Sequence, residues 1–162
     1  IDAVVGDFMA GATEHMVIAC GARGKKLVWV EGQGSIAHPG YSGVTAALLH
    51  GASPDWLILC HDATRHEHKG FPGFPLVPLR EEIAMNEHLL KWTTGGRVVG
   101  VALMTLGLSD EEARKVIQRT ELETGLPTTD VVRYGAGKLV DAVLQASQNL
   151  TRKATPAYPL KR

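Results

Sequence analysis

The residues best suited to chemistry in this sequence lie in one glycine-rich segment, residues 31–43. It directly follows the apolar run 27–30, which we predict to be a buried strand. The carboxyl end of such a strand is where open α/β sheets place ligands, and glycines let backbone N–H groups approach an anion. We therefore predict a set of ligand-binding residues in this segment, namely Gly32, Gln33, Gly34, Ser35 and, at the start of the next helix, Ser42.

Two side chains of the segment could carry a proton or a metal. Glu31 could act as a general base, or hold Mg²⁺, generally through water, beside a phosphate; it could instead accept backbone N–H groups and cap the loop. His38 could act as an acid or base, but a histidine before a proline also shapes turns. Asp7 follows the first predicted strand as Glu31 follows the second, so both carboxylates could meet at one metal site; Asp7 could equally cap a helix.

A second cluster, residues 60–69, contains three histidines and two acidic residues. His61 ends the third predicted strand and could face the same crevice as the glycine-rich segment. Arg65 could bind a phosphate or carboxylate with two hydrogen bonds. The cluster could hold a metal, but a solvated polar loop explains most of it as well.

Asp130 and Arg133 bracket the last predicted strand, and glycines open the helix that follows. This arrangement could clamp an acidic ligand. The alternative is an ordinary ion pair on the protein surface.

The elements that must position these residues alternate along the chain between strand and helix. Apolar runs without polar alternation are typical of strands covered on both faces, and they predict an α/β fold with a mostly parallel sheet and helices on both faces. The predicted strands span residues 1–5, 27–30, 56–60, 98–104 and 129–132. The predicted helices span residues 8–20, 42–50, 79–91, 110–124 and 136–149. We expect one α/β domain over residues 1–150, with residues 151–162 as a peripheral arm.

Composition excludes several function classes. The 162 residues have a formal net charge of zero, which argues against a nucleic-acid partner. No apolar run approaches the roughly 20 residues of a membrane-spanning helix, so no membrane association is expected. Cys20 and Cys60 lie far apart in the sequence, which favours two reduced thiols and a cytoplasmic location over a disulfide framework.

Several segments together resemble a known family. They are residues 1–8, the Val-Glu-Gly-Gln-Gly motif at 30–34, and residues 38–45, 98–103 and 126–133. The family was long catalogued as a domain of unknown function and includes D-glutamate N-acetyltransferases. The resemblance implies a P-loop nucleotide-hydrolase-like fold, distantly similar to dethiobiotin synthetase and the cobyrinate amidases. In that group the motif at 30–34 lies beside the nucleotide's metal and the acyl substrate.

The resemblance also implies segments that these residues do not contain. Longer family members carry a Rossmann-like domain, then the first strand and a P-loop, before the part matched here. The phosphate-binding pattern Gly-x4-Gly-Lys-Ser/Thr is missing from the 162 residues. We therefore expect this chain to be the C-terminal part of a longer protein, and to associate with that preceding segment or to form a homo-oligomer.

Three functions follow as hypotheses. The first is acetyl transfer from acetyl-CoA to the amino group of a small acidic substrate such as D-glutamate. Glu31 or His38 would take the ammonium proton, residues 32–35 would donate hydrogen bonds to the oxyanion, and Arg65 or Arg133 would hold the carboxylates. The second is an ATP-dependent ligase or carboxylate-activating enzyme that uses Mg²⁺ at Asp7 and Glu31, with the P-loop supplied by the preceding segment. The third is a domain that binds a nucleotide or metabolite without catalysis.

Overall fold

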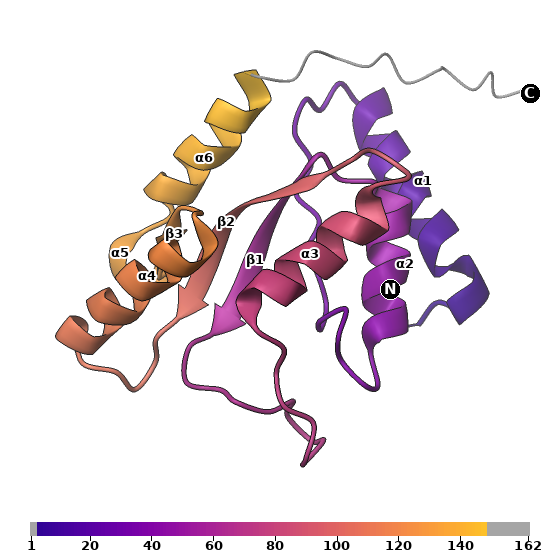
Figure 1. The fold of residues 1–162 in the computed structure, drawn as a ribbon. Helices are drawn as coiled ribbons and strands as arrows, with labels where there is room; N and C mark the ends of the chain where they lie inside the picture. The colour runs from indigo at the N-terminus through magenta and orange to yellow at the C-terminus, as the bar shows by residue number, and fades with distance from the viewer. Residues whose placement is uncertain (1–2, 149–162) are drawn as a thin grey trace, which may run out of the picture.

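The sheet has three parallel strands. In this computed structural model, which describes residues 3–148, they lie in the order β1 (Trp56–Asp62), β2 (Arg97–Met104) and β3 (Thr128–Thr129) (Figure 1). Helix α3 (Leu79–Leu90) joins β1 to β2, and α4 (Asp110–Thr124) joins β2 to β3. Parallel neighbours need such crossover helices. The predicted α/β class with a parallel sheet is confirmed.

Helices cover both faces of this sheet. Val101 and Leu103 of β2 point to one face, where they form a buried cluster with Ile117 of α4. Gly100 points to the other face, where a Cβ atom would lie 2.7 Å from Leu139 of α6 (Gly137–Gln148). Because successive strand residues alternate between faces, α4 and α6 lie on opposite sides. The glycine lets α6 approach the centre of β2 closely.

The first part of the described chain forms a pair of helices beside α3 (Figure 1). A 3₁₀ turn, η1 (Gly6–Phe8), leads into α1 (Met9–Ala22), which packs against α2 (Ser42–Ala52). At their crossing a Cβ on Gly51 would lie only 2.1 Å from the carbonyl oxygen of Ala10. Only glycine allows this close approach of the two backbones.

The Gly51→Ala variant is expected to lower the free energy of unfolding by about 1–3 kcal/mol, because α1 must move away to admit the methyl group. Denaturant unfolding followed by circular dichroism measures the change. Gly43→Ala is the matched control in α2, since nothing lies within 4 Å of its Cβ position. Equal stability of both variants would contradict the close crossing.

Two predicted strands at the start of the chain are wrong. Residues 27–30 have no regular secondary structure, and Trp29 is 65% exposed. Residues 3–5 form a turn and a bend, while Ile1 and Asp2 lie outside the described residues. A strand requires a hydrogen-bonded neighbour. Within residues 3–148, β1 pairs with β2 alone, so residues 27–30 have no partner strand.

The last predicted strand is shorter than expected. Only Thr128–Thr129 pairs with β2, and Val131–Tyr134 forms a short helix, α5. Asp130 explains this change, because its side chain accepts hydrogen bonds from the first backbone N–H groups of α5 and starts a helix there. The predicted arm over residues 151–162 lies outside the described residues. No helix within residues 3–148 is long and apolar enough to cross a membrane.

Candidate functional site

A cavity of about 230 Å³ opens at the carboxyl ends of β1 and β2, between α3 and α4. This is where parallel α/β sheets bind ligands. Leu103 and Val116 form part of an apolar wall. The polar side chains lining the cavity are His61, Arg65, His66, Arg119, Thr120 and Glu123. Two positions predicted from the sequence, 61 and 65, therefore face one cavity.

His61 lies one residue before the end of β1 and is half-buried. Burial lowers the pKa of His61, against the opposing effect of the nearby carboxylates Asp62, Glu82 and Glu123. The lowered pKa favours the neutral form of the imidazole at pH 7. A neutral imidazole has one nitrogen with a free lone pair, which can accept a proton.

Asp62 holds Arg65 at the edge of the cavity. The guanidinium Nη2 lies 3.1 Å from Asp62 Oδ2. Thr64 donates two hydrogen bonds to the other carboxylate oxygen, from its N–H (3.1 Å) and its hydroxyl (2.8 Å). Burial raises the pKa of Asp62, but the Thr64 hydrogen bonds and the Arg65 charge outweigh it and the pKa is lowered. Asp62 stays ionised and orients the arginine.

The glycine-rich segment is anchored beside this cavity. The Ser35 hydroxyl donates to Glu82 Oε1 (2.7 Å) in the first turn of α3 and accepts from the Ala37 N–H (3.0 Å). The Thr45 hydroxyl donates to the Gln33 carbonyl. Glu82 also acts electrostatically on His61. Glu82, in the first turn of α3, therefore lies between the glycine-rich segment and His61, the two groups of site residues predicted from the sequence.

His38 shapes a turn in the same segment. Its Nδ1 accepts hydrogen bonds from the N–H groups of Gly40 (3.1 Å) and Tyr41 (3.2 Å). Its ring centroid lies 4.8 Å from that of His68, which is buried, and 5.0 Å from that of Phe71. These contacts connect the glycine-rich segment to the loop over residues 64–78. The structure therefore favours the turn-forming interpretation of His38.

Glu31 and Asp7 are both exposed. Glu31 lies in irregular chain rather than at a strand end, because the strand predicted before it is missing, and Asp7 lies in η1. Gly32, Gln33 and Gly34 are exposed as well, and Ser42 is the first residue of α2. In the part of the chain that the structure describes, no three or more His, Cys, Asp or Glu side chains are grouped to hold a metal ion. The Mg²⁺ site at Asp7 and Glu31 stays a prediction.

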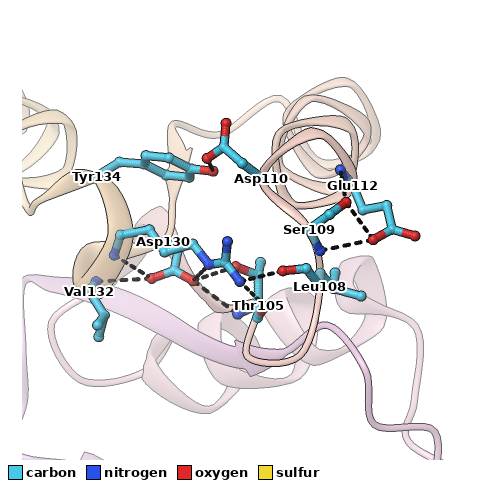
Figure 2. Close-up of polar contacts among 9 residues, drawn as sticks. Thr105, Leu108, Ser109, Asp110, Glu112, Asp130, Val132 and Tyr134 are labelled. Atoms are coloured by element: carbon cyan, nitrogen blue, oxygen red, sulfur yellow. Dashed lines mark hydrogen bonds and ion pairs between the residues drawn. The ribbon is translucent and has the colours of Figure 1, made fainter.

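Neither Asp130 nor Arg133 lines the cavity. Asp130 directly follows β3 and lies beside Thr105, which directly follows β2 (Figure 2), and Arg133 belongs to α5. Asp130 is buried, and its carboxylate accepts four hydrogen bonds. Oδ2 accepts hydrogen bonds from the Thr105 N–H (3.0 Å) and hydroxyl (2.5 Å). Oδ1 accepts hydrogen bonds from the N–H groups of Val132 and Arg133. Arg133 Nη2 donates to the carbonyls of Thr105 (3.0 Å) and Leu108 (2.5 Å). Both side chains therefore connect the loop after β2 to the start of α5. Their role in ligand binding stays a prediction.

Comparison with known proteins places the chain in a family. Residues 1–140 match the family described as "Domain of unknown function (DUF1611_C) P-loop domain". The chain belongs to the DUF1611 family. Two curated relatives, both named D-glutamate N-acetyltransferase, come from Tritonibacter scottomollicae (41% identical over 145 residues) and a Pseudoalteromonas species (32% over 143 residues). These matches cover 88% and 86% of this chain, but 43% and 42% of the relatives.

A solved structure agrees with the fold. The crystal structure of a DUF1611 family protein from Anabaena variabilis is 44% identical and superposes with a TM-score of 0.82. The match covers 89% of this chain and 42% of that protein. The chain thus spans less than half the length of the relatives it matches.

Two charged residues that line the cavity of this DUF1611 domain were not predicted from the sequence. Arg119 and Glu123 reach the cavity from the middle and end of α4. In the sequence they look like ordinary solvated helix positions. Thr120 could have indicated that this part of α4 faces a site, because it is a polar residue on the buried side of the helix, together with Ala113 and Ile117.

Proposed function

We propose that the protein transfers an acetyl group from acetyl-CoA to the amino group of an acidic amino acid such as D-glutamate. The names of the two curated relatives support the reaction class. The observation that carries the proposal is that His61 and Arg65 line the same cavity, where burial lowers the pKa of His61 and favours its neutral form. Because the chain spans less than half of those relatives, the activity belongs to the native protein that contains these residues.

His61 supplies the proton acceptor in this proposal. An amino acid reaches the enzyme with a protonated ammonium group, which has no lone pair for attack. His61 takes one proton, and the free amine then attacks the thioester carbonyl carbon. The new C–N bond gives a tetrahedral intermediate, whose collapse breaks the C–S bond, and a second proton passes from the nitrogen to the departing thiolate of CoA.

The backbone of the glycine-rich segment stabilises the oxyanion. Negative charge develops on the thioester oxygen during attack, and fixed N–H donors lower its energy. Gly32 and Gly34 are exposed and lie outside the cavity lining, in the segment that Ser35 anchors to α3, and Gly34 has a φ of +62°. Ser35 has a positioning role, because its hydroxyl is already bonded to Glu82 and Ala37.

The proposed base, His61, differs from Glu31 and His38, which were expected from the sequence. His38 uses Nδ1 to hold its own turn, and Glu31 is exposed on irregular chain. His61 combines burial, a lowered pKa and a place in the cavity. Glu31 and His38 remain the alternatives against which the variants below are compared.

The native protein, its length fixed by intact mass spectrometry, is expected to release free CoA from acetyl-CoA only when an acidic amino acid is present. Thiol release measures the rate, and mass spectrometry of the product identifies the N-acetylated amino acid. D-Glutamate, L-glutamate and D-glutamine are compared at equal concentration. Failure to form any N-acetylated product would overturn the proposal.

ATP-dependent ligation is the second candidate, because the family is described as a P-loop domain. The 162 residues contain no Gly-x4-Gly-Lys-Ser/Thr loop, so in this hypothesis the triphosphate is held by a P-loop outside them, and both predicted Mg²⁺ ligands are exposed. We therefore assign no step to a nucleotide. Phosphate release from Mg·ATP that depends on the amino acid, without acetyl transfer, would favour the ligase. Binding of either ligand without turnover would favour a metabolite-binding domain.

A further inference from the structure

The cavity between α3 and α4 contains charges of both signs. Arg65 reaches it from the loop after β1, and Arg119 and Glu123 reach it from α4. Arg119 and Glu123 are four residues apart and so lie on the same side of the helix. Among residues 3–148 neither forms an ion pair within 4 Å, whereas Lys115 on the same helix pairs with Glu111 at 2.5 Å.

We infer that this cavity recognises an amino acid with two carboxylates, with Arg65 and Arg119 binding one carboxylate each and Glu123 binding the ammonium group. The choice of an amino acid as ligand rests on the proposed function, but the charge pattern is a property of the cavity. A guanidinium matches a carboxylate with two parallel hydrogen bonds. Apart from the Asp62 carboxylate that orients Arg65, two guanidinium groups and one carboxylate are the complement of two carboxylates and one ammonium.

The rest of the lining agrees with this ligand class. Leu103 and Val116 offer an apolar surface to the methylene groups between the two carboxylates. A volume of about 230 Å³ suits a small metabolite and is below the 300–1,000 Å³ typical of drug-sized ligands. Glu123 acts electrostatically on His61, so an ammonium group beside Glu123 would also lie near the proposed base.

Calorimetry of the native protein, with CoA present, tests the inference with three probes: D-glutamate, D-glutamine and glutarate. With Arg65 assigned to the α-carboxylate and Arg119 to the side-chain carboxylate, the Arg119→Gln variant is expected to bind D-glutamate about tenfold more weakly or worse, and D-glutamine almost unchanged. The Glu123→Gln variant is expected to lose affinity for D-glutamate but not for glutarate, which has no ammonium group. Lys115→Gln and Glu111→Gln are the matched controls, because this ion pair belongs to the same helix but lies outside the cavity lining.

The outcomes separate this inference from the proposed reaction. Acetyl transfer with unchanged affinity and KM in both cavity variants would overturn the cavity assignment and leave the reaction standing. Binding of D-glutamate that depends on Arg119 and Glu123, without acetyl transfer, would support the cavity and overturn the reaction. Absence of both binding and transfer would overturn both. Thermal unfolding of each variant confirms that a loss of binding is not a loss of folding.

Discussion

Replacing His61 with asparagine is expected to lower kcat for acetyl transfer by about 10²- to 10⁴-fold. Asparagine retains a polar side chain of similar length at the end of β1, but it cannot take a proton from the ammonium group. KM for the amino acid should change much less, since Arg65 and Arg119 remain in place. Steady-state kinetics with the thiol-release assay measure both parameters, and thermal unfolding checks the fold.

The pH profile identifies the base. In the unchanged protein kcat should fall on the acidic side, because protonated His61 cannot accept a second proton. Burial lowers the pKa of His61, so this fall should lie below the usual histidine value of about 6.5 and be absent from the His61→Asn variant. His50→Asn, an exposed histidine of α2, is the control. If Glu31→Gln removed the acidic fall and His61→Asn kept it, the base would be Glu31.

Local sequence signals predicted their elements correctly. The Ser109 to Glu112 spacing predicts a helix start, and α4 begins with both reciprocal hydrogen bonds of a capping box. Gly125 ends the same helix with a φ of +71°. These interactions join residues at most four positions apart, so the sequence contains all the information they need.

Features that depend on distant partners could not be predicted. Residues 27–30 have the composition of a strand, but a strand also needs a neighbour, and no residue in the run specifies one. From the sequence, Asp130 could be part of a clamp for an acidic ligand or of a surface ion pair with Arg133, because its buried partner Thr105 is 25 positions away. The cavity combines Arg65 with Arg119 of a later helix, so their proximity follows from the packing of α3 and α4.

The Asp130→Asn variant is expected to lower the free energy of unfolding by about 3 kcal/mol at pH 7. The buried carboxylate accepts four hydrogen bonds, two from Thr105 and one each from the N–H groups of Val132 and Arg133. An asparagine side chain has one acceptor oxygen, and its NH₂ group would face donors on the other side. Denaturant unfolding measures the loss.

The same contacts make this stability depend on pH. Burial raises the pKa of Asp130, but its hydrogen bonds with Thr105, Arg133 and Val132 outweigh burial and lower the pKa below its usual value of about 3.9. A lowered carboxyl pKa contributes stability that is fully present above the unfolded value and is lost as pH falls through the folded value. The difference between the unchanged protein and Asp130→Asn should therefore be constant above about pH 5 and shrink below about pH 4.

Asp141→Asn, on the exposed side of α6, is the control and should change the free energy of unfolding by about 0.5 kcal/mol or less. Asp130→Asn tests the junction of two chain segments, because Thr105 directly follows β2 and Val132 lies in the first turn of α5, after β3. If the two variants were equally stable, the carboxylate would not hold these loops together. Asp130 and Arg133 would then again be candidates for binding a ligand at the strand ends.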